Sequence, residues 1–184
     1  GHWPSESQEW KDEAVRRWGA LVSAGEADDW EAFVLSRLSK PPPPSPMDLL
    51  QEYYAHDTWQ LLVACALMSR VNSWTHKHNC ISGFFEKFPT PSAFIAADMN
   101  VVREIMYPLG LFDIRLKTLT ELSKKYLSMP AFTLDETENK IWGCGRFVVD
   151  SYKIFCRSEG TTLTPDDATL HSFVRWLRCQ PSHS

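Results

Sequence analysis

The residues with the clearest chemical potential lie near the end of the chain, where a Gly-x-Gly turn precedes an apolar, helix-forming run. The turn is Gly143-Cys144-Gly145, and a carboxylate pair, Asp166-Asp167, follows about twenty residues later. Small residues in a tight turn expose backbone N–H groups at a helix N-terminus, and such an end attracts anions such as phosphate. A carboxylate held near a bound phosphodiester suits chemistry on a nucleic acid, which is the first hypothesis for this chain.

Plainer interpretations of these residues stay open. Without other context, a Gly-x-Gly pattern is more often an ordinary turn than a phosphate site. Asp167 can serve as the N-cap of the helix that follows it, because Asp is a preferred capping residue. Asp166 is an equally placed rival for any catalytic role.

The composition limits the class of protein. The chain has 184 residues, of which 43% are hydrophobic, so one domain or a domain with an appendage can bury a core. No apolar run approaches the roughly 18 residues of a membrane span, and the first residues do not form a secretory signal. The five cysteines lack the spacing of a zinc or iron–sulfur site, which predicts free thiols in a reducing compartment.

The net charge of −4 argues against a general nucleic-acid binder, but the charge is unevenly distributed. Residues 1–57 carry five basic and eleven acidic side chains, whereas residues 58–184 carry fourteen basic and twelve acidic side chains. A local basic groove in the second part is therefore compatible with the sequence.

Apolar residues recur at helical spacing and period-2 alternation is nearly absent, which predicts an all-α protein built of short helices. A proline-rich segment, residues 40–46, separates an N-terminal helix pair (1–40) from the main domain (41–184), and Asp57 is the expected N-cap of an apolar helix. The predicted helices are 9–24, 28–38, 46–55, 58–69, 73–87, 91–97, 99–106, 112–128, 146–157 and 167–178.

Several segments follow one another along the chain in a recognisable order: residues 48–52, 56–62, 69–70, 108–113, 115–118, 143–145, 150–156 and 165–167. Through these segments, from about Ser45 to about Leu177, the chain resembles the helix-hairpin-helix DNA glycosylase superfamily. Within it, the catalytic domains of the methyl-CpG-binding-domain thymine/uracil mismatch glycosylases are the most similar branch. The resemblance implies a bundle of short helices with a DNA-binding cleft, preceded here by an extra helix pair.

The resemblance implies roles around an extruded base. Asp167 matches the catalytic aspartate, and Gln51 matches the glutamine that reads the flipped pyrimidine. Phe147 would line the base pocket where the mismatch glycosylases have a Tyr, so it keeps a stacking face and loses a hydrogen bond worth roughly 0.5–1.5 kcal/mol. An ionised carboxylate beside the sugar would stabilise an oxocarbenium-like transition state.

The resemblance also implies how DNA would be held. Arg70 matches the side chain that fills the gap left by the flipped base, and Leu109-Gly110-Leu111 matches the wedge that faces the widowed guanine. Gly143 and Gly145 match the hairpin that binds a backbone phosphate, often with a monovalent cation. Taken singly, Gln51 would more often be solvated, Arg70 a partner of the preceding helix dipole, and the two leucines core residues of a turn.

Two absences refine the expected chemistry. Bifunctional members of the superfamily place a Lys where this chain has Phe147, and Phe cannot form a Schiff base, so a monofunctional enzyme without lyase activity is expected. The four-cysteine loop of the iron–sulfur members is missing, so neither a cluster nor another cofactor is expected. The expected partner is double-stranded DNA with a mismatched or damaged pyrimidine, bound by a nuclear monomer.

Two other classes of function stay open. Phe147 and the pair Ala168-Thr169, where the family has His-Lys, are also compatible with a module that binds mismatched or modified DNA without cutting it. The acidic N-terminal helices and the proline-rich segment are compatible with a helical adaptor for other proteins.

Overall fold

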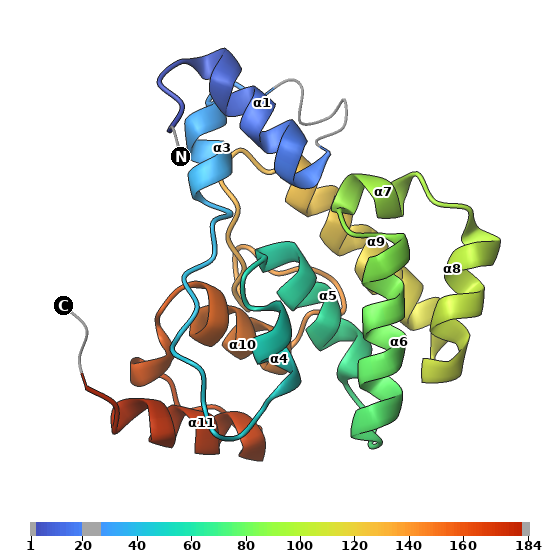
Figure 1. Cartoon of the computed structure of the whole chain (residues 1–184), viewed down its shortest axis with the longest axis vertical. Helices are drawn as coiled ribbons and strands as arrows, with labels where there is room; N and C mark the ends of the chain where they lie inside the picture. Colours follow the sequence, from blue (N-terminus) through green and yellow to red (C-terminus); the bar gives the residue numbers. More distant parts are fainter. Residues whose placement is uncertain (1–2, 20–26, 182–184) are drawn as a thin grey trace.

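The computed structural model describes residues 3–19 and 27–181, and every regular element within these ranges is a helix (Figure 1). The prediction of an all-α protein is therefore confirmed. Extended backbone pairs at one isolated bridge, between Lys40 and Arg157. Among the helices of the described ranges, none is long and apolar enough to cross a membrane.

The order of elements follows the predicted order. The N-terminal pair is α1 (Ser7–Trp18) and α3 (Trp30–Leu35), and after the proline-rich segment come α4 (Leu50–Tyr54) and α5 (Thr58–Met68). The middle of the chain forms α6 (Trp74–Lys87), α7 (Pro91–Ile95), α8 (Met99–Met106), the 3-10 turn η1 (Tyr107–Leu109) and α9 (Phe112–Ser128). A long loop leads to α10 (Arg146–Cys156), η2 (Gly160–Thr162) and α11 (Ala168–Arg178).

The expected N-cap Asp57 is present, but the predicted helices 9–24, 28–38, 46–55 and 91–97 have different limits in the structure. The Asp57 carboxylate accepts a hydrogen bond from the Gln60 N–H at 2.9 Å, as a cap should. Helix α1 ends at Trp18 because Gly19 adopts a left-handed φ of +62° and its N–H bonds back to Val15. The predicted continuation of that helix, residues 20–24, lies outside the described residues.

The predicted helix 46–55 begins only at Leu50. The Glu52 carboxylate folds back and accepts hydrogen bonds from the backbone N–H groups of Ser45 and Leu49, at 2.7 and 2.8 Å. Asp48, between them, has a left-handed φ of +54° that is incompatible with a helix. The segment before α4 is therefore an ordered loop held by one carboxylate.

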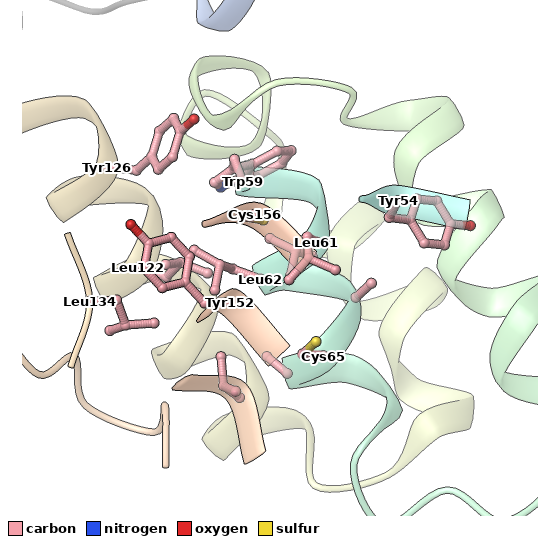
Figure 2. Packing of buried hydrophobic residues seen from close by; sticks show 14 of the residues in the cluster. Tyr54, Trp59, Leu61, Leu62, Cys65, Leu122, Tyr126, Leu134, Tyr152 and Cys156 are labelled. Carbon is pink, nitrogen blue, oxygen red and sulfur yellow. The ribbon is translucent and has the colours of Figure 1, made fainter. Parts of the chain in front are cut away.

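Helix α5 is the centre of the core and packs against α4, α6, α9 and α10. Its side chains from Leu61 to Cys65 are fully buried, as expected for a run that is apolar on every side. Figure 2 shows this helix beside Tyr126 and Tyr152, which come from α9 and α10. The one polar atom of the buried Trp59 ring is satisfied, because its N–H donates to Ser123 Oγ at 3.0 Å.

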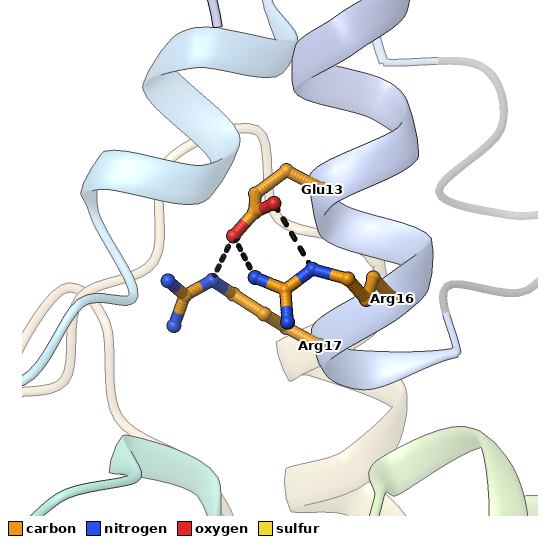
Figure 3. A network of polar contacts seen from close by, with 3 residues as sticks. All are labelled: Glu13, Arg16 and Arg17. Atoms are coloured by element: carbon orange, nitrogen blue, oxygen red, sulfur yellow. Dashed lines mark hydrogen bonds and ion pairs between the residues drawn. The ribbon is translucent and has the colours of Figure 1, made fainter. Parts of the chain in front are cut away.

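The N-terminal pair packs on the main body through aromatic side chains. The buried Trp18 ring lies edge-on to Phe33 of α3 and to Tyr126 of α9, with centroids 6.1 and 5.8 Å apart. Trp18 therefore joins the N-terminal pair to the main body. The outer face of α1 is polar instead, with the Glu13 carboxylate shared by Arg16 and Arg17 (Figure 3).

The buried guanidinium of Arg37 also fixes the junction between the N-terminal pair and the main body. Arg37 is 1% exposed, and its guanidinium donates two hydrogen bonds to the Tyr126 carbonyl, at 2.9 and 2.7 Å, and one to the Met129 carbonyl at 2.6 Å. Tyr126 is in the last turn of α9, and the residue four positions on is Pro130, which has no N–H to offer. Arg37 thus caps the C-terminus of α9, and burial lowers its pKa to about 10.

Replacing Arg37 with Met should lower the free energy of unfolding by about 3 kcal/mol, because buried carbonyls of α9 would lose their donors. Urea unfolding followed by circular dichroism measures this change. The exposed Arg16→Met variant is the matched control and should change stability by less than about 0.5 kcal/mol. Equal effects of the two substitutions would show that Arg37 does not cap α9.

Candidate functional site

A cavity of about 530 Å³ brings together four of the predicted site residues, although they come from distant parts of the sequence. Gln51 enters from α4, Arg70 from the loop after α5, Phe147 from α10 and Asp167 from the residue before α11. The volume is typical of a site for a small organic group. The remaining lining residues are Met47, Asp48, Leu49, Leu50, Met68, Ser69, Val71, Trp74, Lys77 and Thr169.

Gln51 is only 2% exposed, so the interpretation of this residue as a solvated surface glutamine is wrong. Its amide nitrogen lies 3.4 Å from the Oγ of Ser151, a fully buried residue of α10. This contact joins α4 to α10 and orients the amide at the cavity wall. A fixed amide can offer both a donor and an acceptor to a bound ring.

Asp167 caps a helix and also lines the cavity. It is the N-cap of α11, because its Oδ2 accepts a hydrogen bond from the Leu170 N–H at 3.0 Å. The capping interpretation is therefore confirmed. The same half-buried carboxylate lines the cavity, and within the described part of the chain its Oδ1 has no hydrogen-bond partner. One oxygen is thus free for a ligand while the other fixes the side chain.

Asp166, the rival carboxylate, has a different role. Its Oδ2 lies 2.5 Å from Nη1 of Arg146, and Nη2 of the same guanidinium donates to the Thr164 carbonyl at 2.7 Å. Arg146 is the first residue of α10, so this fork ties the loop before Asp167 to that helix. Asp167 lines the cavity and Asp166 holds the loop, which separates two residues that the sequence left equivalent.

Arg70 stands between two hollows. It lines the cavity together with Ser69, and both residues also border a second hollow of about 330 Å³ that reaches Leu111 and Gly143. The side chain is exposed and its backbone has a left-handed φ of +64°, which is uncommon for a residue with a side chain. Arg70 therefore lies where the predicted base pocket and the predicted wedge and hairpin meet.

Arg115, and not Arg70, donates hydrogen bonds to the last carbonyls of α5. Arg115 is 4% exposed and donates to the carbonyls of Ala66, Ser69 and Gly110, at 2.7, 2.8 and 2.9 Å. Burial and, less strongly, the charge of Arg70 lower the pKa of Arg115. One guanidinium thus caps α5 and also holds the loop that carries the predicted wedge.

The predicted wedge divides into a buried and an exposed part. Leu109 is 8% exposed and belongs to the core, whereas Leu111 is 46% exposed with a left-handed φ of +50°. Gly110, with φ of +75°, makes the turn between them. In this structure the apolar side chain available to a partner on this loop is that of Leu111, while Leu109 anchors the loop.

The predicted hairpin depends on Gly143. Its φ is +83°, and a Cβ there would lie 2.0 Å from Thr118 Oγ1 of α9, so only glycine fits this close contact. Gly145, in contrast, has open space around it and is the N-cap of α10. Among the described residues no side chain caps that helix start, so its first N–H groups are available to an anion.

The chemistry of the donors limits which metal could bind near this turn. Within residues 3–19 and 27–181, no three His, Cys, Asp or Glu side chains form a group that could hold a metal ion. Backbone carbonyls of the turn are the remaining donors, and they suit a weakly held monovalent cation better than a transition metal. The cation that the resemblance implies at Gly143–Gly145 stays a prediction.

No known family model matches the chain. Over 137 residues, 74% of its length, the chain is 30% identical to the methyl-CpG-binding domain protein 4-like protein of Arabidopsis thaliana. The match covers 30% of that protein, so this chain spans less than a third of the length of its relative.

Substituting Gly143 by Ala should lower the free energy of unfolding by about 2–4 kcal/mol, because a left-handed φ and a clash with Thr118 act together. Gly145→Ala is the matched control, since its φ is negative and a Cβ meets nothing, and it should cost less than about 1 kcal/mol. Thermal and urea unfolding of both variants measure the difference. Equal losses would contradict the close packing of the turn on α9.

Replacing Arg115 with Lys should lower the free energy of unfolding by about 1–3 kcal/mol, because an ammonium cannot serve three separated carbonyls at once. Arg103→Lys is the control: Arg103 is exposed and lies over the Phe112 ring at 4.3 Å. Hydrogen exchange should also show faster opening at the end of α5 in the Arg115 variant alone. Unchanged exchange there would argue against the cap.

Proposed function

We propose that the chain is a monofunctional DNA glycosylase that removes thymine or uracil mispaired with guanine. The observation that carries this proposal is the single cavity that joins Gln51, Phe147 and Asp167, with Arg70 at its border. The similarity to a methyl-CpG-binding domain protein 4-like protein supports the same class. The proposal includes the helix-hairpin-helix fold of that superfamily, with Gly143 and Gly145 in its hairpin.

The geometry is compatible with extrusion of a base from the duplex. A base inside a duplex is inaccessible, so it must be flipped out, and a mismatched pair costs less to open. Arg70 would occupy the space that the base leaves, and Leu111 would press against the remaining guanine from the neighbouring hollow. The uncapped start of α10 would hold a backbone phosphate of the same strand.

The chemical step would then fall to Asp167. The bond between the sugar C1′ and the base nitrogen breaks, and its electron pair leaves with the pyrimidine. The resulting positive charge on the sugar is stabilised by the carboxylate, which also orients the attacking water. The Gln51 amide donates to the departing base, and Phe147 supplies an apolar wall. Water adds at C1′ and loses a proton, so the products are a free base and an intact strand with an abasic site.

We also propose the substrate, the oligomeric state, the location and the cofactor requirement of the enzyme. The substrate is double-stranded DNA with a mismatched or damaged pyrimidine, the protein acts as a monomer in the nucleus, and no cofactor or iron–sulfur cluster takes part. Phe147 cannot form a Schiff base, so no strand cleavage should accompany base release.

Asp167→Asn should reduce the single-turnover rate of base release from G·U and G·T duplexes by about a hundredfold or more. Because Asn is as good an N-cap as Asp, the variant should keep its thermal stability. Asp166→Asn is the matched control, since it removes a carboxylate one position away, and it should keep most of the activity.

Treating the DNA with hot alkali after the reaction distinguishes the proposed glycosylase from the other possible functions. Breaks that require alkali indicate a monofunctional glycosylase, whereas breaks without alkali would contradict the role given to Phe147. Mismatch binding without any product would favour a DNA-binding module. Absence of DNA binding at low salt would favour a protein adaptor, because phosphate contacts strengthen steeply as salt falls.

A further inference from the structure

An aromatic cluster that reaches the cavity through Trp74 has none of the roles proposed above. It consists of Tyr53 from α4 and Trp74 and His78 from α6. Trp74 lines the cavity and is 42% exposed, although large aromatic side chains are normally buried. We infer that Trp74 is a stacking platform for the base that is extruded into the cavity, an inference that rests on the proposed DNA substrate.

Neighbouring rings hold the Trp74 side chain in place. Trp74 is stacked on His78 at 4.8 Å with an angle of 8° between the planes, and Tyr53 meets both rings edge-on. The Tyr53 hydroxyl in turn donates to Asp48 Oδ1 at 2.8 Å. A rigid aromatic surface binds a flat ligand at low cost in side-chain entropy, since the order exists before binding.

His78 supports Trp74 through its ring and not through a hydrogen bond of its buried Nδ1. Within the described residues, the buried Nδ1 of His78 has no hydrogen-bond partner. The three rings are joined to one another by ring contacts, while Tyr53 also donates to Asp48, and the exposed part of the Trp74 ring offers a bound group a π-face. Base–aromatic stacking has this character and tolerates different bases.

The cavity wall carries the kinds of groups that suit a nucleobase. Trp74 on α6 and Phe147 on α10 are two aromatic side chains of one cavity, and Gln51 supplies an amide. Arg70 and Lys77 add positive charge for phosphate, against the carboxylates of Asp48 and Asp167. A planar, hydrogen-bonding group attached to a phosphate backbone, which is a nucleobase in a DNA strand, fits all of these features.

Equilibrium binding to three labelled duplexes tests the inference. One carries a G·U mismatch with an uncleavable 2′-fluoroarabino uridine, the second a tetrahydrofuran abasic analogue opposite G, and the third a G·C pair. Trp74→Ala should weaken binding to the G·U duplex by about tenfold or more and leave the other two within about twofold. Trp74→Phe should recover most of the loss, because it keeps an aromatic face.

Trp3→Ala is the matched control, because Trp3 is exposed and lies on the N-terminal segment away from the cavity. Equal weakening of the G·U and abasic duplexes by Trp74→Ala would overturn the inference, since the contact would then not involve the extruded base. No effect of Trp74→Ala, or no preference of the unmodified protein for G·U over G·C, would also overturn it.

Failure of the proposed function gives a different result. If the unmodified protein releases no base but Trp74→Ala abolishes its preference for the mismatch, the glycosylase proposal fails and the stacking platform stands. If base release is intact and unaffected by Trp74→Ala at limiting and saturating enzyme, the platform fails and the glycosylase proposal stands.

Discussion

The architecture depends on satisfying backbone carbonyls where central helices end inside the molecule. The last carbonyls of a helix have no partner within it, and leaving them buried and unpaired is costly. Two buried arginines meet this constraint: Arg115 at the end of α5 and Arg37 at the end of α9. Arg115 also donates to the Gly110 carbonyl, and Arg37, which follows α3, also donates to the Phe33 carbonyl within that helix, so the guanidinium that ends one helix joins it to another part of the chain.

The candidate site depends on similar contacts made by exposed arginines. Arg146 holds the Thr164 carbonyl, and Arg178 of α11 donates to the carbonyls of Thr161 and Leu163, at 2.9 and 2.7 Å. The loop before Asp167 is thus fixed from α10 and from α11 together. The residues that could act on a ligand are few, but their relative positions are set by side chains that never contact it.

The sequence predicts the helices well and the details of the site unevenly. Periodicity and capping chemistry identify α5 with its Asp57 cap and α11 with its Asp167 cap, because both signals are local. Leu109 and Leu111 look alike in the sequence, and only the positive φ values of the turn bury one and expose the other. The three carbonyls around Arg115 are brought together by tertiary packing, which a local sequence pattern does not reveal. A large aromatic side chain such as that of Trp74 favours a core position, but Trp74 is exposed in the structure.

In the proposed mechanism, the double use of the Asp167 carboxylate links base release to the local opening of a helix end. Helix termini fray on fast timescales, and a residue that caps a first turn loses its fixed orientation each time that turn opens. Asp167 keeps its position only while Leu170 N–H stays bonded to it. The fraction of molecules with a correctly aimed carboxylate is therefore set by the equilibrium between the closed and frayed first turn of α11. Warming would reduce that fraction before the protein as a whole begins to unfold.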